Sequence, residues 1–520
     1  MRRHTVTSAL PLITLLVATL CPAYAALQVS RDPRLVDDTY ITLTYVKNLV
    51  AGNGFVFNHP PPTLGTTTPL NTFGLVALAR LLPDTDIERL AVVFSTACWV
   101  MAAWLFYWFR HSWGLTAWQA SLVGVMVSTW DNIAFLGTEA FLFAMLLILA
   151  SSLFFAKRYA LAGFVGGLMA LTRGEGILVL PIMMAWCIVA ARWPALAHVA
   201  TASVDSDRRG TKNGNRRRRL AGSDVVPLLK LAAGFLPPIA AWCVYAYSTF
   251  GYVLPNTLAA KQAQVRSGLW PSFLSELIYT WPKEWGEPYG LYGVFGRVLW
   301  WALALIGLYA IFTRKRRFLL LALWTATYTA GYITLYVAGY WWYQTPIVFL
   351  LTLCVALGVV TCIDTVLRLR VPRRNAVVAA SLMAAGSVFP FALFLVEDAA
   401  FYEGDKRARF YHNLARWVRE NTQREDSIGY IEVGYLAYFT GNRIVDFGGL
   451  VTPGMTPYVR KADFANALFE FLPDYYIEST TFDPWLHAIK EDPRFPHTYR
   501  YLDKMRGPYN SIVTCYRRID

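Results

Sequence analysis

Two adjacent aspartates, Asp37 and Asp38, open the stretch DDTYITLTYVKNLVAGNGFVFN. Aspartate is a preferred residue at the start of a helix, and the following TYITLTYVKNLV has the composition of a helix, so capping explains one of the two. It does not explain both, because a helix has one N-cap position. Neighbouring carboxylates raise each other's proton affinity, which suits a general base that takes a proton from a hydroxyl. We expect Asp37 to be this base and Asp38 to be the cap, a second ligand for the acceptor or a metal ligand.

Three threonines, Thr66, Thr67 and Thr68, stand immediately before Pro69 at the start of an expected helix. Their hydroxyl groups can serve in an ordinary turn or cap, or they can bind a polar substrate. The sequence leaves both interpretations open.

Ionisable residues within or at the ends of apolar segments are costly, and their positions are therefore informative. Glu139 begins an apolar segment in GTEAFLF, and Arg173 and Glu175 flank a glycine in LTRGEG. The helix dipole alone can account for Glu139, and a surface ion pair around a tight turn can account for the other two. A polar site at one face of a membrane is the alternative.

Two further segments carry candidate binding residues. LPNTLAAKQAQVR contains Asn256, Lys261 and Arg266, and the aromatic segment GYWWYQTP contains Tyr343 and Gln344. Isolated basic residues are usually solvated, and tryptophan and tyrosine at a membrane boundary usually anchor a helix. For each of these residues the sequence leaves both the ordinary role and the binding role open.

The elements that must position these residues are strongly apolar. Of the 520 residues, 56% are hydrophobic and 16% are charged, which excludes an ordinary soluble protein. We expect a polytopic α-helical membrane protein with about 11 transmembrane helices, because apolar runs of roughly 20 residues can cross a bilayer. The runs lie at 8–26, 88–109, 114–130, 137–156, 160–172, 175–192, 226–249, 293–312, 318–337, 346–367 and 376–396.

The net charge of +14 is concentrated in short loops at 207–219, 314–317 and 368–374. The positive-inside rule places these loops in the cytoplasm, so the charge orients the protein in the plasma (inner) membrane and nucleic acid is not expected as a partner. The N-terminus is then cytoplasmic. All the candidate residues named above, and the chain after 397, fall on the extracytoplasmic side.

Two features of the N-terminal region bear on this topology. The segment PLNTFGLVALARLLP, 69–83, must not cross, and it is just shorter than the roughly 17 residues that a crossing needs. We interpret it as a juxtamembrane helix at the outer surface. The chain also begins like a secretory signal, with a basic start and AYA before Ala26, so cleavage there is an alternative to a retained first helix.

The composition changes after residue 396. RARFYHNLARWVREN predicts an amphipathic helix, and IGYIEVGYLAYFTGNRIVDFGGL alternates strand-forming residues with turns. We expect residues 1–396 to form the membrane domain, with a first extracytoplasmic loop at 27–87, and 397–520 to form a soluble extracytoplasmic α/β domain. The seven cysteines predict neither a disulfide framework nor a metal cluster, and no internal repeat of the transporter type is visible.

The ordered set of motifs resembles a known family. DDTYITLTYVKNLVAGNGFVFN, GTTTPL, GTEAFLF, LTRGEG, LPNTLAAK and GYLAYFTGNRIVDFGGL together resemble the C-type (GT-C) membrane glycosyltransferases, which use polyprenyl-phosphate sugars. The likeness is greatest to the subgroup of mycobacterial terminal arabinofuranosyltransferases. Thr138 before Glu139, and Gly174 in LTRGEG, depart from the usual residues of that subgroup.

The resemblance implies an inverting transfer of a sugar, arabinofuranose in that subgroup, to a cell-envelope glycan, lipid or protein. Asp37 would be the general base, and Lys261, Arg173 or Arg266 would bind the donor phosphate. The residues assigned to the sugar or acceptor are Glu139, Thr67, Asn256, Tyr343 and Gln344. A divalent cation, Mg²⁺ or Mn²⁺, held by Asp37 and Asp38 stays open.

Three alternatives accompany this hypothesis. A transporter or lipid-carrier flippase would need charged groups near the middle of the bilayer, whereas these acids stand at one face. A noncatalytic scaffold of the cell envelope would tolerate Asp37→Asn. Within the enzymes, a ligase that takes diphosphate-linked glycans is the third.

Overall fold

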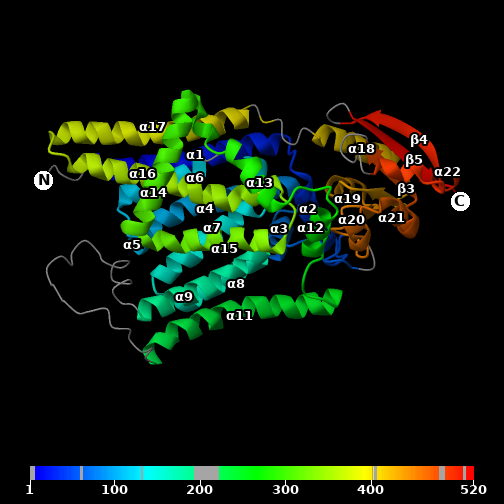
Figure 1. The fold of residues 1–520 in the computed structure, drawn as a ribbon, viewed down its shortest axis with the longest axis horizontal. Helices are drawn as coiled ribbons and strands as arrows, with labels where there is room; N and C mark the ends of the chain where they lie inside the picture. Colours follow the sequence, from blue (N-terminus) through cyan, green and yellow to red (C-terminus); the bar gives the residue numbers. More distant parts are fainter. Residues whose placement is uncertain are drawn as a thin grey trace.

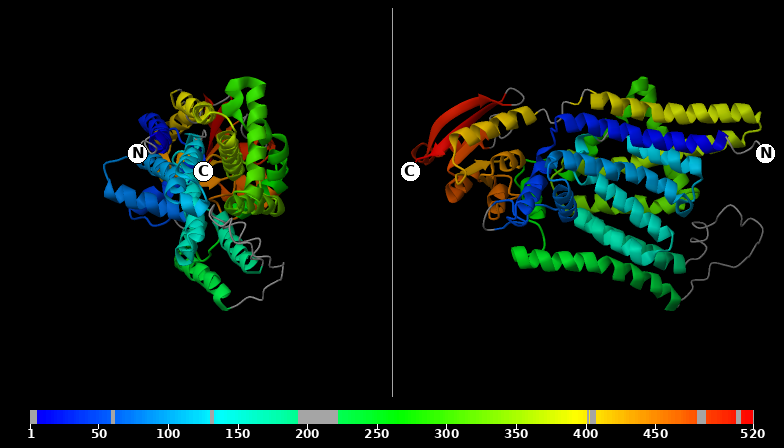
Figure 2. Two further views of the ribbon diagram at one scale, coloured as in Figure 1. Left: turned by 90° about the vertical axis from the view of Figure 1, so that its left-hand side faces the viewer. Right: turned by 180° about the vertical axis from the view of Figure 1, so that it is seen from behind.

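The computed structural model describes residues 6–58, 62–129, 133–192, 222–400, 402, 407–479, 486–507 and 511–519. Figure 1 shows a bundle of long helices and, at one end of it, a smaller domain near the C-terminus. The views in Figure 2 show the same division, with the C-terminal domain at one end of the helix bundle.

The bundle consists of apolar helices whose positions match the expected spans. They are α1 (Val6–Arg31), α4 (Ile87–Trp108), α6 (Ala117–Thr129), α7 (Ala140–Phe155), α8 (Tyr159–Thr172), α9 (Val179–Arg192), α11 (Gly222–Phe250), α14 (Gly293–Thr313), α15 (Leu319–Leu335), α16 (Thr345–Arg368) and α17 (Arg373–Ala400).

Within the described ranges, 8 helices are long and apolar enough to cross a membrane, and three more apolar helices are shorter. The short ones are Ala117–Ser128, Ala140–Phe155 and Tyr159–Thr172. The fold class expected from the sequence, a polytopic α-helical membrane protein, is confirmed. The number of helices that cross stays a prediction.

Glycines allow α8 and α11 to approach closely. A Cβ atom on Gly163 would lie 2.1 Å from the carbonyl oxygen of Leu231, and one on Gly234 would lie 1.9 Å from that of Ala160. Helices that gain little from the hydrophobic effect inside a membrane associate through such small residues, because their backbones can then pack directly.

Shorter elements lie between the bundle and the C-terminal domain (Figure 1). They include α2 (Asp37–Val50), α3 (Pro69–Leu81), α12 (Thr257–Arg266), α13 (Phe273–Tyr279) and the 3₁₀ turn η6 (Trp341–Gln344). Helix α3 is the segment expected to lie at the surface, and its 13 residues span about 20 Å, too little to cross a bilayer of about 30 Å. It packs against α2 and α4.

The remaining short elements connect the bundle helices. These are α5 (Arg110–Trp113), η1 (Ile133–Phe135), η2 (Gly174–Leu178), η3 (Trp281–Lys283), η4 (Glu287–Tyr292) and η5 (Arg316–Phe318).

The C-terminal domain is built around a five-stranded mixed sheet in the order β2-β1-β3-β5-β4. Strand β1 pairs in parallel with β2 and β3, and β5 pairs antiparallel with β3 and β4. The strands are β1 (Ser427–Tyr430), β2 (Arg443–Asp446), β3 (Tyr475–Ser479), β4 (Tyr499–Arg506) and β5 (Ile512–Arg518), and the helical elements are α18 (Ala408–Asn421), α19 (Gly434–Thr440), α20 (Thr456–Lys461), α21 (Phe464–Phe471), η7 (His487–Glu491) and α22 (Phe495–Thr498). The expected α/β class and the amphipathic helix α18 are confirmed.

One part of the sequence interpretation of this domain was wrong. GYLAYFT, 434–440, was expected to continue a pattern of strands and turns, but it forms α19. Its residues Tyr435 to Tyr438 are all buried, because α19 packs against both α2 and α18. Tertiary packing therefore overrides the strand propensity of its aromatic residues.

The basic loop 314–317 lies at the end of the bundle remote from the C-terminal domain. Lys315 and Arg317 donate hydrogen bonds to the carbonyl oxygens of Gly114 and His111, which follow the far end of α4. The near end of α4 carries Glu88, which accepts a hydrogen bond from Tyr438 of the C-terminal domain. The basic loop 207–219 lies outside the described residues.

Candidate active site

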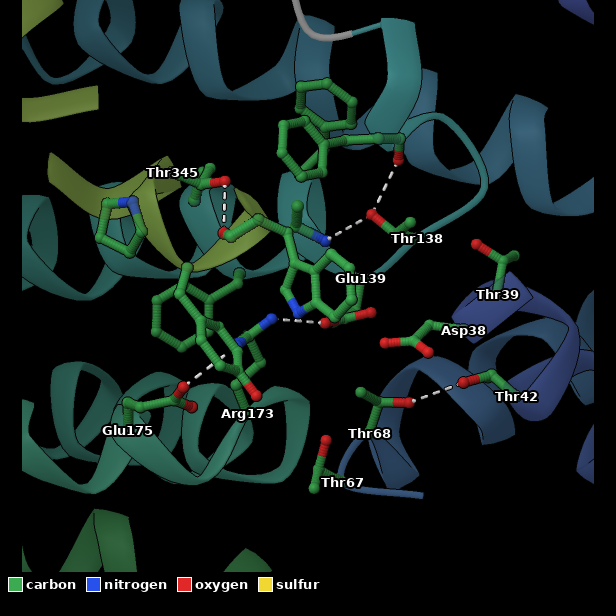
Figure 3. A pocket seen from close by; sticks show the side chains of 18 of the residues that line it. Asp38, Thr39, Thr42, Thr67, Thr68, Thr138, Glu139, Arg173, Glu175 and Thr345 are labelled. Atoms are coloured by element: carbon green, nitrogen blue, oxygen red, sulfur yellow. Dashed lines mark hydrogen bonds and ion pairs between the residues drawn. The ribbon is translucent and has the colours of Figure 1, made fainter. Parts of the chain in front are cut away.

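A pocket lies where the helix bundle meets the C-terminal domain, since its lining combines bundle residues with Leu450 of that domain. Its polar side chains come from α2, the segment 65–68, the start of α7, the α8–η2 junction, α12 and η6. Figure 3 labels those of α2, of the threonine segment, of the start of α7 and of the α8–η2 junction. Its deeper walls are apolar and include Trp99, Ala102, Val127, Leu147, Trp324 and Phe349. The pocket therefore combines a charged part with an apolar part that matches a hydrocarbon chain.

The two adjacent aspartates point in different directions. Asp38 lines the pocket, and Figure 3 shows its carboxylate directed toward the side that carries Glu139. Asp37 is 7% exposed, and its two oxygens accept hydrogen bonds from the backbone amides of Gly434 (3.0 Å) and Tyr435 (2.9 Å). Burial and the neighbouring Glu432 raise the pKa of Asp37 to about 8, against the lowering effect of the two amides.

This geometry revises the roles expected from the sequence. Asp37 is occupied by the C-terminal domain and is absent from the described lining of the pocket, so it is badly placed to reach a substrate hydroxyl. Asp38 has the exposure to the pocket that a base needs. The N-cap position of α2 is Val36, so capping explains neither carboxylate.

The threonines expected before α3 line the pocket next to Asp38. The hydroxyl of Thr68 lies 3.0 Å from that of Thr66 and 3.3 Å from that of Thr42, forming a short chain of hydroxyl groups. Thr67 also lines the pocket. Thr66 in addition accepts a hydrogen bond from the backbone amide of Thr68, so the turn role and the pocket role coexist.

Arg173 is neutralised by two carboxylates. Its guanidinium lies 2.8 Å from Glu139 and 3.1 Å from Glu175 (Figure 3). Glu175 also accepts a hydrogen bond from the hydroxyl of Tyr332. The three charged residues therefore form one network on the wall of the pocket, and Arg173 has little charge left for a ligand.

Lys261 is the contrasting cation. It is 5% exposed and lines the pocket, and its Nζ lies 3.6 Å from the centre of the Tyr340 ring and 5.8 Å from that of Trp342. Within the described part of the chain, Nζ makes no hydrogen bond or ion pair. Burial lowers its pKa, while Asp38, Asp446 and Glu432 act in the opposite direction. An ammonium group held in this way is suited to bind an anion that enters the pocket.

The other candidates divide between the pocket and its surroundings. Tyr343 lines the pocket. Gln344 lines an adjoining cavity, where it accepts a hydrogen bond from Trp285. Asn256 is outside the described lining and donates to the carbonyl of Gly449. Arg266 is exposed and also outside the lining, so it is not placed to bind a donor phosphate.

Sequence reasoning missed several residues of the pocket. Trp342, which lines the pocket, was interpreted as a membrane anchor, although its ring lies 5.8 Å from Nζ of Lys261. Tyr340 is outside the described lining, but its ring lies closer to Nζ, at 3.6 Å. Leu450 comes from the C-terminal domain and lines the same pocket. A leucine in a loop carries no chemical signal, so only the folded chain reveals it.

The described residues do not provide a metal site. They contain no group of three or more His, Cys, Asp or Glu residues arranged to hold an ion. Asp37 is also engaged by two amides, which leaves Asp38 alone of the expected pair.

Comparisons with solved structures identify the fold. The oligosaccharyltransferase AglB from Archaeoglobus fulgidus, solved with an inhibitory peptide and a dolichol-phosphate, has a TM-score of 0.58 at 12% identity over 97% of this chain and 74% of that one. ArnT from Cupriavidus metallidurans, solved with undecaprenyl phosphate, has a TM-score of 0.53 at 13% identity over 98% of this chain and 97% of that one. The chain therefore shares the fold of these proteins, and the GT-C-like fold expected from the sequence is confirmed.

Finer relationships are weaker. The arabinofuranosyltransferase AftD from Mycobacteria has a TM-score of 0.49 at 13% identity, and the match spans 96% of this chain and 39% of AftD. The subgroup expected from the sequence stays a prediction. Residues 400–516, the C-terminal domain, match a family described as Domain of unknown function (DUF8728). No curated protein sequence matches the chain.

Proposed function

We propose that this protein is a membrane glycosyltransferase that moves a sugar from a polyprenyl-phosphate donor to an acceptor hydroxyl. The observation that carries the proposal is one pocket that contains the Asp38 carboxylate and the buried ammonium group of Lys261. A carboxylate can take the proton of the attacking hydroxyl, and a cation can stabilise a departing phosphate.

The reaction follows from these two roles. The acceptor oxygen attacks the anomeric carbon while its proton passes to Asp38. The bond between that carbon and the phosphate oxygen breaks, and the lipid phosphate leaves with its negative charge beside Lys261. Attack opposite the leaving group inverts the configuration of the anomeric carbon.

The apolar interior of the pocket supports a lipid-linked donor. Residues such as Trp99, Leu147 and Phe349 offer a surface for an isoprenoid chain, while Lys261 is held in the charged part. AglB and ArnT, which share the fold, were solved with dolichol-phosphate and undecaprenyl phosphate. Both observations favour a polyprenyl phosphate over a soluble sugar nucleotide.

The wall formed by Arg173 and Glu139 is suited to the sugar. Both side chains are fixed by their ion pair and line the pocket, so they can hydrogen-bond hydroxyl groups without first being ordered. Thr67 and Tyr343 add neutral polar groups. Arabinofuranose is the sugar that the sequence resemblance implies, and a glycan, lipid or protein of the cell envelope is the corresponding acceptor.

The same proposal includes the orientation in the membrane. The basic loop 314–317 and the C-terminal domain lie at opposite ends of α4, as the positive-inside rule requires if the loop is cytoplasmic and the domain is outside. The pocket, at the junction with that domain, would then open on the extracytoplasmic side.

The test compares adjacent carboxylates in the purified protein. Wild type, Asp38→Asn and Asp37→Asn are reconstituted in proteoliposomes with a panel of polyprenyl-phosphate sugars and cell-envelope acceptor, and release of lipid phosphate is measured. Asp38→Asn should lower turnover by about 10³-fold or more, the size of effect found for general bases, while Asp37→Asn should retain part of the activity. Equal turnover of wild type and Asp38→Asn would reject Asp38 as the base.

The donor panel also separates the alternative classes. Monophosphate-linked and diphosphate-linked sugars are supplied together as competing donors. The proposed enzyme should use the monophosphate donor, whereas a ligase for diphosphate-linked glycans should use the diphosphate donor. A flippase would move labelled lipid across the bilayer without breaking the bond between sugar and phosphate. Transbilayer movement without bond cleavage would therefore contradict the proposal.

A further inference from the structure

The proposed base and the proposed phosphate-binding cation stand on elements that are far apart in the sequence. Asp38 is on α2 and Lys261 is on α12. Both helices pack against the C-terminal domain, α2 against α19 and α12 against α20. In Figure 1 these four helices lie together at the junction between the bundle and the domain.

The first contact joins α19 to α2. The backbone amides of Gly434 and Tyr435 donate to the two oxygens of Asp37 at 3.0 and 2.9 Å. The Tyr435 hydroxyl donates to the carbonyl of Leu35 (2.7 Å), and its ring lies 4.2 Å from that of Tyr40. These bonds flank Asp38 in the sequence, so they fix the backbone from which its side chain projects.

The second contact joins the loop 446–451 to α12. Gln264 donates to the carbonyl of Gly448 (3.0 Å), and Asn256 donates to that of Gly449 (2.6 Å). Ala263 lies in the apolar core of the C-terminal domain, together with Phe447 and other residues of that domain. Helix α12 is therefore docked into the domain by apolar burial and by hydrogen bonds.

The loop that makes this contact is itself held in one conformation. The buried carboxylate of Asp446 accepts hydrogen bonds from the backbone amides of Gly448 (2.7 Å), Leu450 (2.5 Å) and Val451 (3.0 Å). The same loop presents Leu450 to the pocket. A loop ordered in this way can hold a partner helix at a fixed distance.

A short chain of contacts connects this loop to the cation. Gln264 accepts a hydrogen bond from the Tyr340 hydroxyl (2.7 Å), and the ring of Tyr340 lies under Nζ of Lys261 at 3.6 Å. Gly448, Gln264, Tyr340 and Lys261 thus form a continuous path from the C-terminal domain to the pocket.

We infer that the C-terminal domain is a positioning part of the active site, with α19 holding Asp38 through Asp37 and the loop 446–451 holding Lys261 through Gln264 and Tyr340. The inference rests on the proposed function and extends it, because it gives the two contacts separate kinetic roles. Small displacements of a catalytic group from its productive geometry are costly, so loss of the α19 contact lowers kcat. Loss of the α12 contact weakens donor binding and raises the KM for the donor.

Gly434→Ala tests the first contact. A Cβ atom at this position would lie 2.0 Å from the carbonyl oxygen of Asp37, so α19 and α2 must separate. We expect kcat to fall by about 10- to 100-fold with the donor KM nearly unchanged. Gly290→Ala is the matched control, because its Cβ atom meets nothing within 4 Å.

Gln264→Leu tests the second contact by removing both hydrogen bonds of a buried side chain with little change in volume. We expect the donor KM to rise by about 10-fold, corresponding to one lost hydrogen-bonded contact, with kcat nearly unchanged. Gln262→Leu is the matched control on the same helix, since Gln262 is bound to the carbonyl of Leu335 in the bundle and not to the C-terminal domain.

Hydrogen exchange of the full chain in nanodiscs provides a readout that does not depend on activity. Gly434→Ala should increase exchange in α2 and leave α12 protected, and Gln264→Leu should do the reverse. If no donor is turned over, the proposed function fails while this pattern still tests the two contacts. Should Gly434→Ala not fold, Tyr435→Phe removes one hydrogen bond of the same contact and carries the same expectation in milder form.

Two results would overturn the inference. In the first, Gly434→Ala and Gln264→Leu show the same hydrogen exchange and the same kinetics as their controls. The bundle alone would then hold α2 and α12 in place. In the second, both variants show the same fall in kcat and the same rise in KM. The two contacts would then have no separate kinetic roles, and the domain would only stabilise the fold.

Discussion

Nζ of Lys261 lies 3.6 Å from the centre of the Tyr340 ring, and within the described part of the chain it makes no ion pair with a carboxylate. Arg173, on the wall of the same pocket, is bound by both Glu139 and Glu175. The pocket therefore contains one cation in a network of direct ion pairs and one without a direct ion pair. This difference separates a structural role from a ligand-binding role, because a buried charge without a partner is unfavourable until an anion arrives.

Lys261→Gln should therefore abolish most of the proposed transferase activity. Removing one donor that stabilises developing negative charge typically costs about 10²- to 10³-fold in rate, and we expect an effect of that size. Initial rates of lipid-phosphate release over a range of donor concentrations measure it as a loss of kcat/KM, to which weaker binding of the donor phosphate contributes. Arg266→Gln is the control on the same helix, because Arg266 is exposed and lies outside the described lining of the pocket. An equal loss in both variants would contradict the assignment.

Arg173→Gln should destabilise the protein. The substitution leaves the carboxylates of Glu139 and Glu175 without their cation in a mostly buried site, at a cost of about 3 kcal/mol. Thermal unfolding in detergent should show a lower midpoint, and the double variant Arg173→Gln/Glu175→Gln should recover part of the loss. Lys261→Gln, by contrast, removes an unpaired buried charge and should not lower the midpoint.

The stability of the C-terminal domain should depend on pH through Asp446. Burial raises the pKa of this carboxyl to about 6, although the backbone amides of Val451, Gly448 and Leu450 lower it. The folded state then binds the proton more tightly than the unfolded state, whose pKa is about 3.9. The contribution of this group to the free energy of unfolding is fully present below about pH 4 and is lost as the pH rises through about 6. This contribution is about 3 kcal/mol at most.

Unfolding midpoints of wild type and Asp446→Asn between pH 4 and 7 measure this effect. The wild type should lose stability relative to Asp446→Asn as the pH rises, since the asparagine does not titrate. Glu425→Gln, at an exposed position of the same domain, should keep the pH dependence of the wild type. A constant difference between wild type and Asp446→Asn across the range would contradict the raised pKa.

Gly234→Ala should loosen the packing of α8 against α11. The added Cβ atom would lie 1.9 Å from the carbonyl oxygen of Ala160, so the helices must move apart, at a cost of about 1 to 3 kcal/mol. The midpoint of thermal unfolding should fall accordingly. Gly331→Ala in α15 is the matched control, because its Cβ atom meets nothing within 4 Å, and it should leave the midpoint unchanged.

Much of the architecture follows from local sequence. The positions of the bundle helices, the short surface helix α3 and the α/β class of the C-terminal domain were all predictable, because apolar runs of sufficient length can satisfy their backbone in a membrane only as helices. The pocket residues Asp38, Thr67, Glu139, Arg173, Lys261 and Tyr343 were also singled out by residue type. Charged groups at the ends of apolar segments are rare enough to carry that signal.

The direction of each side chain was not predictable. Consecutive residues on a helix point about 100° apart, so Asp37 and Asp38 cannot face the same way, and the sequence does not say which of them faces the pocket. The packing of α2 against α19 decides it, by pairing Asp37 with the amides of Gly434 and Tyr435.

The sequence by itself thus determined that this is a helical membrane protein with acidic and basic groups gathered near the ends of its spans. Only the tertiary structure decided that Asp38 and Lys261 share a pocket and that Arg266 does not. It also brought Leu450 and the loop 446–451 to the same place from the far end of the chain. The physical reason is that composition and periodicity act over a few residues, whereas the site is formed by contacts between segments hundreds of residues apart, which only the packed fold brings together.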